Sequence, residues 1–368
     1  MDQAQPRRAC AKHYLGMAAA ARKGRKARCA ASRRPCYKTR DPADRFSAAP
    51  RPSMTLVSIP ANPVPEGAIA GTLKTPDGVE LRFARFTPPP GRKGTLCLFL
   101  GRAEFIEKYF EVIEDARARG FAVATLDWRG QGLSEHALRD PRKGHISDFS
   151  QYETDLETFM KEVVLPDCPP PFFALGHSMG ASILIRTAYR NRRWFDRVVL
   201  SAPMVDLNLV GMPRLARTSV RMLQLMGAGT SYIPGGGATA IASQPFAGNP
   251  LTSDPVRYAR TGAIIDAEPR LGLGSPTIAW TAAAFRAMSD FVDPAFPARI
   301  RQPLLIIAAG QDVIVSTEAI EQFAIRLRAG AHLVVPRARH EIMMEQDRFR
   351  GQFWAAFDAF VPGSPTYR

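Results

Sequence analysis

The chain has 368 residues, of which 46% are hydrophobic and 23% are charged, and its formal net charge is +15. These proportions are ordinary for a globular protein and allow one large buried core. Residues 1–53 contain 14 Lys and Arg against 3 Asp and Glu, so most of the positive charge lies in this segment. The remainder of the chain is close to neutral, which argues against specific nucleic-acid binding by that remainder.

The first segment, residues 1–53, is rich in Ala and Arg and has little apolar periodicity. We expect a basic, disordered tail, because it lacks the strongly apolar stretch of a signal peptide. One hypothesis is that Met54 is the native start, and the other is that the tail is a basic arm for polyanions or a membrane. No later stretch is long enough for a transmembrane helix. Cys97 lies in an apolar run that is typical of a buried strand, so we expect no disulfide framework. A reducing compartment fits this, and we expect a cytoplasmic location, either free or peripherally associated with the inner face of the membrane.

Beyond the tail, short apolar runs alternate with longer stretches of helical periodicity. Strands are expected at residues 79–86, 95–100, 121–126, 172–175, 197–201, 304–309 and 332–335. Helices are expected at residues 105–119, 149–164, 179–190, 316–328 and 345–360. This alternation predicts an α/β fold, with a mostly parallel central sheet and helices on both faces.

A long interval separates the strands expected at 197–201 and 304–309, and it exceeds an ordinary connection several-fold. We therefore expect an inserted cap at residues 203–298, with residues 54–202 and 299–368 forming the core. Residues 212–226 predict a basic amphipathic helix, which suits an anionic lipid surface or an acyl pocket. A solvated arginine face over a packed cap is the alternative interpretation. The glycine-rich segments within the cap, residues 231–237 and 271–276, are expected to be mobile loops.

The most informative motif is Gly176-His177-Ser178-Met179-Gly180, which follows the fourth expected strand and precedes an expected helix. This is the pattern of a nucleophile elbow, in which glycines on both sides leave room for a sharp strand-to-helix turn. Such a turn lifts a serine hydroxyl out of the sheet and presents it to a base. The motif predicts that Ser178 is the nucleophile of a serine hydrolase.

A catalytic triad in this fold requires an acid and then a histidine after the serine. Asp312 comes just past the apolar run 304–309, where parallel sheets place functional groups, and is preferred over Asp290 and Asp293 as the acid. His340 lies in a loop after the last expected strand, whereas His332 falls within that strand. The predicted acid and base are therefore Asp312 and His340.

An oxyanion hole requires two backbone N–H groups near the nucleophile. The residue after the serine, Met179, supplies the first, and Arg102, in the loop after the strand expected at 95–100, is predicted to supply the second. The Arg102 side chain is expected either to meet an anionic group of the substrate or to be solvated at the surface. Glu104 is expected to support either this loop or the substrate.

Five separated motifs, at residues 101–109, 126–134, 176–180, 310–312 and 339–341, resemble the α/β-hydrolase family of lysophospholipases and monoacylglycerol lipases. This family is also grouped with serine aminopeptidases. The resemblance covers roughly residues 70–358 and is strongest for the bacterial lysophospholipases. It implies an α/β-hydrolase fold with a cap.

The resemblance also implies roles for individual residues. Ser178 corresponds to the family's nucleophile, Asp312 to its acid and His340 to its base, and the N–H groups of Met179 and Arg102 correspond to its oxyanion donors. Monoacylglycerol lipases usually have His-Gly in the oxyanion loop, where this chain has Leu-Gly, so the resemblance favours a lysophospholipase over a monoacylglycerol lipase.

These observations predict a serine carboxylester hydrolase, most consistent with a lysophospholipase that acts through an acyl-enzyme on a small lipid or ester. The alternatives are a monoacylglycerol lipase, a broad esterase, an aminopeptidase of the same fold, or a noncatalytic ligand-binding relative. An aminopeptidase would need an acidic cluster in the cap, and Asp254, Asp266 and Glu268 are scattered. We expect no cofactor and no metal, because the chain lacks metal-ligand spacing and a phosphate-cradling glycine loop.

Overall fold

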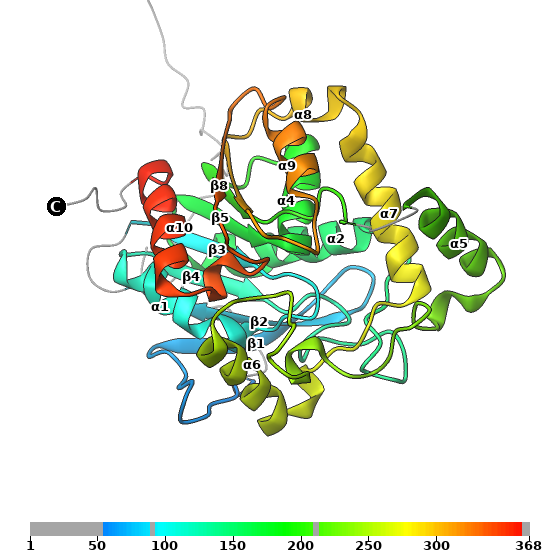
Figure 1. Cartoon of the computed structure of the whole chain (residues 1–368). Coiled ribbons are helices and arrows are strands. Elements are labelled where there is room, and N and C mark those ends of the chain that lie inside the picture. Colours follow the sequence, from blue (N-terminus) through cyan, green and yellow to red (C-terminus); the bar gives the residue numbers. More distant parts are fainter. Residues whose placement is uncertain (1–53, 89–92, 209–212, 363–368) are drawn as a thin grey trace, which may run out of the picture. The chain divides into compact units, whose positions relative to one another are not determined.

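The computed structural model describes residues 54–88, 93–208 and 213–362, and the predicted basic tail at 1–53 lies outside them. Eight strands form one sheet in the order β1-β2-β4-β3-β5-β6-β7-β8. All neighbouring pairs from β4 to β8 are parallel, whereas β2 pairs antiparallel with both β1 and β4, which confirms the predicted mostly parallel sheet. The strands in Figure 1 are β1 (Ala68–Lys74), β2 (Glu80–Phe86), β3 (Thr95–Phe99), β4 (Ala122–Leu126), β5 (Phe172–His177), β6 (Arg197–Ser201), β7 (Leu304–Ala309) and β8 (Gly330–Val335).

Helices cover both faces of this sheet because its central strands are apolar on both sides. In β3, Cys97 and Phe99 belong to one buried cluster, and Leu96 and Leu98 belong to another. Side chains of a strand alternate between the two faces, so each cluster is the core on one face. Figure 1 shows the two layers of helices, which are α1 (Phe110–Ala118) and α10 (Asp347–Phe360) on one face, and α2 (Ser150–Phe159), α4 (Ser178–Tyr189) and α9 (Thr317–Ala324) on the other.

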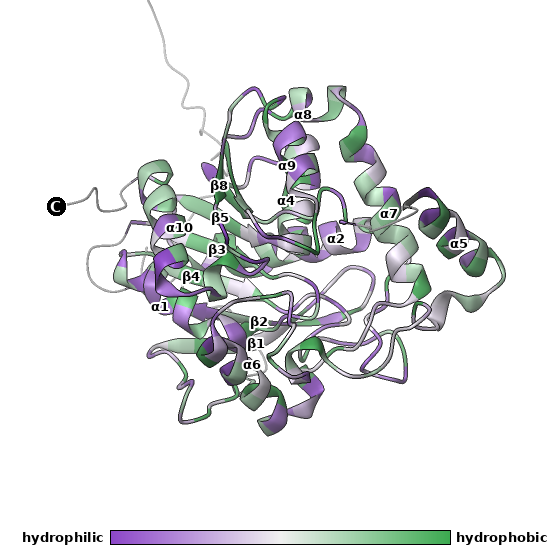
Figure 2. Cartoon of the chain, viewed as in Figure 1, coloured by the Kyte–Doolittle hydropathy of each residue, from purple (hydrophilic) through white to green (hydrophobic). Residues whose placement is uncertain are grey.

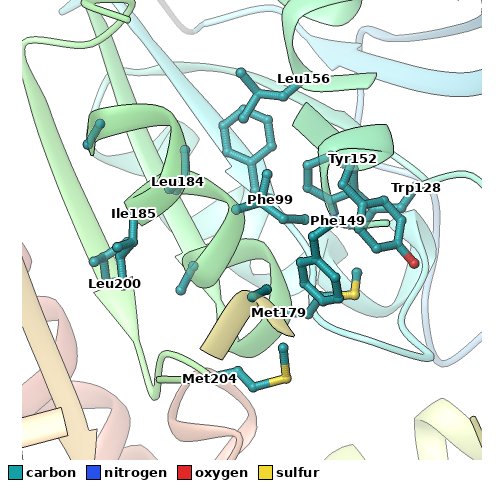
Figure 3. Close-up of a cluster of buried hydrophobic side chains, with 14 of the residues drawn as sticks. Phe99, Trp128, Phe149, Tyr152, Leu156, Met179, Leu184, Ile185, Leu200 and Met204 are labelled. Carbon is teal, nitrogen blue, oxygen red and sulfur yellow. The ribbon is translucent and has the colours of Figure 1, made fainter. Parts of the chain in front are cut away.

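The core between β3, α2 and α4 is dense in aromatic rings. Phe99 stacks on Trp128 with 5.8 Å between ring centroids, and Trp128 meets Tyr152 edge to face at 5.5 Å. Met179, directly after the elbow serine, belongs to the same cluster, which Figure 3 draws. Because this packing is continuous, the elbow rests on a rigid support.

Two local features differ from the expected pattern. The edge strand β1 was not expected: its exposed Ile69 and its Gly71 weaken the apolar signal, and it is stabilised by antiparallel pairing with β2. The helix expected at 149–164 is present as α2 but passes through a wider turn at Met160–Val164 before α3 (Leu165–Asp167). The type of an element was thus predictable where apolar periodicity was strong. It was not predictable for the edge strand β1, where that periodicity is weak.

The interval between β6 and β7 contains helices of its own. These are α5 (Pro213–Leu225), α6 (Pro255–Ala267), α7 (Ile278–Val292) and α8 (Ala295–Arg299). α5 matches the predicted amphipathic helix, and α7 is buried along most of its length in the core cluster beside α2 and α4. The glycine-rich segments expected to be mobile are joined by backbone hydrogen bonds, from Ser275 to Gly237 and from Ile233 to Pro276.

Candidate active site

The elbow motif lies at the junction of β5 and α4. Ser178 begins α4, and its φ of 49° falls in the left-handed region, which L-residues rarely adopt. A Cβ atom at Gly180 would lie 2.4 Å from the carbonyl oxygen of Phe99, and one at Gly176 would lie 2.9 Å from the α4 backbone. The two glycines therefore allow α4 to start against the end of β3, with the serine at the apex of the turn.

Three residues that follow three different strands form a hydrogen-bonded row at this apex. Ser178 Oγ lies 3.0 Å from His340 Nε2, and His340 Nδ1 lies 2.6 Å from Asp312 Oδ2. The other carboxylate oxygen of Asp312 accepts hydrogen bonds from the N–H groups of Ile314 and Val315. Asp312 is thereby oriented by its own loop, and the helix that follows is capped by a different residue, Ser316.

The electrostatics of the row suit a base held by an acid. Burial alone lowers the pKa of His340, but the charge and hydrogen bond of Asp312 outweigh it, so that pKa lies above its ordinary value. Burial raises the pKa of Asp312, and the opposing effects of His340 and the two backbone N–H groups bring it below its ordinary value. The carboxylate is therefore ionised at neutral pH and favours an imidazolium at His340.

A second histidine, His177, packs against the base, with 4.8 Å between its ring centroid and that of His340. Burial lowers the pKa of His177 to about 4, an effect that the charge of Glu104 only partly offsets. His177 is therefore neutral at neutral pH and adds no second positive charge beside His340.

A buried polar cluster adjoins His177, whose Nε2 lies 3.8 Å from Glu104 Oε1. Lys108 Nζ donates to Glu104 at 2.8 Å and to Glu341 at 2.6 Å, and the Tyr109 hydroxyl donates to Glu104 at 2.7 Å. Glu104 also accepts the N–H of Gly101. Burial raises the pKa of Glu104, but Lys108 and its other partners bring it down to about 2. Of the two roles expected for Glu104, these contacts are those of loop support.

The loop after β3 lines the same cavity as Ser178 and contains one N–H group without a partner in the described residues. The flanking N–H groups are engaged, that of Gly101 by Glu104 and that of Ala103 by Gln131 at 3.1 Å. Gln131 also donates to the Gly101 carbonyl at 3.0 Å. Within the described residues the Arg102 N–H has no hydrogen-bond partner. A second donor is available at Met179, in the first turn of α4, where N–H groups lack helical partners.

Beneath this loop lies a charged group that the sequence did not predict. Arg82 is fully buried and pairs with Glu107 at 2.7 Å and with Asp127 at 2.6 Å. Asp127 also accepts the N–H groups of Ile106 and Leu133. These contacts join the antiparallel edge of the sheet to the loops that follow β3 and β4. The sequence signal that could have indicated this group was the position of Glu107 and Asp127 among apolar residues, because a buried carboxylate requires a charged partner.

The row opens into a cavity of about 390 Å³ between the sheet edge and the insertion. Much of its wall is apolar, and its polar groups include His177, Ser178 and His340, as expected for a site that binds an amphiphilic molecule. Its wall includes Arg102, Leu207, Ile241, Leu251, Leu273, Trp280 and Val315. A hollow of about 420 Å³ beside Tyr189 contains none of the predicted catalytic residues, so volume alone does not identify the site.

Three of the remaining acidic candidates form ion pairs with arginines. Asp254 caps α6 and pairs with Arg257, Glu268 pairs with Arg270, and Asp290 pairs with Arg186. No group of three or more His, Cys, Asp or Glu side chains in the described ranges is arranged to hold a metal ion. None of the described helices has the length and apolarity needed to cross a bilayer.

Curated proteins with similar sequences include lipid hydrolases. Lysophospholipase L2 of Escherichia coli strain K12 is 29% identical over 283 residues, which cover 74% of this chain and 82% of that protein. A monoacylglycerol lipase of Mycolicibacterium smegmatis is 27% identical over 277 residues, which cover 74% of this chain and 89% of the relative.

Solved structures with the same fold include a soluble variant of monoglyceride lipase from Saccharomyces cerevisiae, with a TM-score of 0.63 at 18% identity, covering 79% of this chain and 94% of that one. A carboxyl esterase from Bacillus coagulans superimposes with a TM-score of 0.64 at 20% identity, covering 82% and 99%. At such identities these structures support the α/β-hydrolase fold. The family model described as serine aminopeptidase, S33, matches residues 90–347, and the chain therefore belongs to this family of α/β-hydrolases.

Proposed function

We propose that the protein is a lysophospholipase that hydrolyses the carboxylic ester of a lysophospholipid through an acyl-enzyme. The observation that carries this proposal is the row Ser178–His340–Asp312, whose serine and histidine line a cavity with a largely apolar wall. A serine, a base and an orienting acid at hydrogen-bond distance form the constellation for nucleophilic attack on an ester.

In the proposed mechanism, Ser178 Oγ attacks the ester carbonyl while His340 Nε2 takes its proton. The tetrahedral oxyanion accepts hydrogen bonds from the N–H groups of Arg102 and Met179. Asp312 stabilises the imidazolium, which then protonates the departing glycerol oxygen. Water activated by the same histidine attacks the acyl-enzyme and releases the fatty acid, after which Ser178 regains its proton.

The substrate class rests on two supports. The relatives described above include a protein named lysophospholipase L2 and another named monoacylglycerol lipase. The cavity wall includes Leu207, Ile241, Leu251 and Val315, a surface on which an acyl chain is stabilised by burial of its methylene groups. Monoacylglycerol hydrolysis is the second candidate, since it shares the ester and the acyl chain.

The test is fatty-acid release from lysophosphatidylcholine, from monoacylglycerol and from p-nitrophenyl esters. Ser178→Ala should lower the rate on the order of 10⁶-fold. Ser289→Ala is the matched control, because Ser289 is an exposed serine on α7 that donates to the Arg286 carbonyl and does not line this cavity. Turnover of short esters alone would reject the lysophospholipase assignment, and full activity of Ser178→Ala would reject the mechanism.

We further propose that α5 associates with an anionic lipid surface, at the inner face of the membrane. Leu215, Met222 and Leu225 are 57%, 54% and 75% exposed. Arg214 and Arg221 are exposed beside them and form no ion pair within the described residues. Figure 2 shows apolar and polar residues side by side on this helix. Exposed apolar side chains flanked by cations are the pattern of a helix that lies in a membrane interface.

Cosedimentation with vesicles of phosphatidylglycerol and phosphatidylcholine tests this second proposal. The double variant Met222→Ser, Leu225→Ser should lose most of the vesicle-bound fraction. The control Val292→Ser, which changes an exposed apolar residue at the end of α7, should retain it. Equal binding by the double variant and the wild type would reject α5 as the contact.

A further inference from the structure

The Arg102 side chain enters the cavity that contains Ser178. Its Nη2 donates to the Gly274 carbonyl at 2.7 Å, and its guanidinium lies 5.2 Å from the centroid of the Trp280 ring. Its Nε is enclosed by protein and has no hydrogen-bond partner. Of the two environments expected from the sequence, a partly buried guanidinium over an aromatic ring at the cavity wall favours contact with an anionic substrate group over a freely solvated position.

Other buried cations differ from Arg102 because each of them is paired with carboxylates. Arg82 pairs with two carboxylates, Arg129 pairs with Asp77 and Asp155, and Lys108 also has two acidic partners. Within the described residues Arg102 forms no ion pair with any carboxylate. The carboxylates that line the same cavity, Glu104 and Glu341, are engaged by Lys108.

Arg102 remains charged despite this isolation. Burial lowers the pKa of its guanidinium to about 10, which still leaves it protonated at neutral pH. A charge removed from water without an ionic partner costs free energy, and an anion in the cavity would offset that cost. The electrostatic environment therefore favours a negatively charged ligand group in the cavity that Arg102 and Ser178 both line.

The guanidinium is also held in position before any ligand arrives. The indole N–H of Trp280 donates to the Tyr152 hydroxyl at 3.0 Å, which fixes the ring beneath Arg102. Trp280 packs on Phe149 as well, with 5.9 Å between centroids. An arginine stacked on a fixed aromatic ring loses little side-chain entropy when it binds an anion.

We propose that Arg102 binds the substrate twice, with its backbone N–H at the ester oxyanion and its guanidinium at the phosphate of the lysophospholipid. This inference rests on the proposed function and adds the group that distinguishes a phosphate-bearing substrate from a neutral monoacylglycerol. The backbone N–H and the guanidinium of an arginine are separated by its side chain, and the ester and the phosphate of a lysophospholipid are separated by its glycerol. The two groups of Arg102 can therefore be matched to the two groups of the substrate. A planar guanidinium forms paired hydrogen bonds with phosphate oxygens.

The first test compares kcat/KM for lysophosphatidylglycerol and for monoacylglycerol with the same acyl chain. Arg102→Met preserves the backbone N–H and should lower kcat/KM for the phospholipid about 10- to 100-fold, the range for loss of a charged hydrogen bond. Monoacylglycerol has no phosphate, so its kcat/KM should fall by a smaller factor, and the readout is the ratio of the two losses. Arg102→Lys should fall between the two, since it keeps the charge but loses the paired geometry.

A second measurement does not depend on turnover of lysophospholipid. Glycerol 3-phosphate should inhibit hydrolysis of p-nitrophenyl butyrate by the wild type more strongly than glycerol does, and Arg102→Met should raise its inhibition constant about tenfold or more. The matched control is Arg299→Met, because Arg299 also lies over an aromatic ring, that of Tyr189 at 5.6 Å, and does not line this cavity.

The outcomes separate the two proposals. Equal losses on the phospholipid and monoacylglycerol, or unchanged inhibition by glycerol 3-phosphate in Arg102→Met, would overturn the assignment of Arg102 while leaving the esterase intact. Absence of fatty-acid release from any lysophospholipid by the wild type would instead overturn the proposed function. Phosphate-selective loss in Arg102→Met, together with weaker inhibition, supports the inference.

Discussion

Two regions of the molecule differ in whether their polar and apolar groups are paired within the chain. They are the carboxyl end of the sheet, where Ser178 lies, and the helix α5 in the insertion. At the sheet edge, Asp312 and Glu104 each accept three hydrogen bonds from neighbouring groups. On α5, Leu225 is 75% exposed, and Arg221 is exposed and without an ion pair in the part of the chain described. The first region is fixed by its own contacts, whereas the second offers groups to something outside the chain.

This difference predicts which property a substitution will change in each region. Chemistry requires atoms held within a fraction of an ångström, so reacting groups are supported by buried, paired side chains. A lipid surface presents no fixed geometry, so exposed apolar and cationic side chains are sufficient to bind it. Substitutions at the sheet edge should therefore alter catalysis or folding, and substitutions on the outer face of α5 should alter neither.

The largest effect is expected for Asp312→Asn. Loss of the carboxylate removes the charge that stabilises the His340 imidazolium, and kcat should fall about 10⁴-fold. The measurement is steady-state hydrolysis of a soluble p-nitrophenyl ester. A decrease of less than about tenfold would show that Asp312 is not the acid, and the same substitution at Asp293, Asp293→Asn, serves as the control.

The pH profile sharpens this prediction. His340 can accept a proton only when it is neutral, and its pKa is raised by Asp312. The wild-type kcat/KM should therefore fall on the acid side, with a midpoint above the ordinary histidine value of about 6.5. In Asp312→Asn the midpoint should move to lower pH. An acid limb below the ordinary value in the wild type would contradict the assignment.

The next largest effect is expected on folding, for Lys108→Met. This change leaves Glu104 and Glu341 buried without their cation, and the free energy of unfolding should fall by about 3–5 kcal/mol. Denaturant titration followed by circular dichroism measures it. Lys161→Met is the control, because Lys161 is 54% exposed and its pair with Glu157 should contribute no more than about 0.5 kcal/mol. Equal stability of the two variants would remove the distinction between the buried cluster and a surface pair.

The smallest effect is expected for Leu225→Ser on α5. Because Leu225 is exposed, the free energy of unfolding should change by less than about 0.5 kcal/mol, and hydrolysis of a soluble ester should be unaffected. Val220→Ala on the buried face of the same helix should lower stability more, since Val220 is only 8% exposed. A large loss of stability in Leu225→Ser would mean that this face packs against protein.

Parts of the site were predictable because their signals are local. A serine between Gly176 and Gly180, after an apolar strand, specifies a tight turn through steric necessity alone. Asp312 and His340 could be proposed because each follows a strand, and parallel strands bring their carboxyl ends to one edge. Their hydrogen bonds depend on the order β5-β6-β7-β8, which an alternating pattern predicts only in outline.

The amino-acid sequence by itself determined the fold class, the elbow and an amphipathic α5, because backbone sterics and apolar periodicity act over short distances. Only the tertiary structure decided that Arg82 pairs with Glu107 and Asp127, and that Arg102 lies over Trp280 at the wall of the cavity. Their partners come from distant segments, and whether a charge is paired or left facing a cavity depends on which segments meet. The physical reason is that pairing and burial are properties of three-dimensional neighbours, whereas the sequence records only the neighbours along the chain.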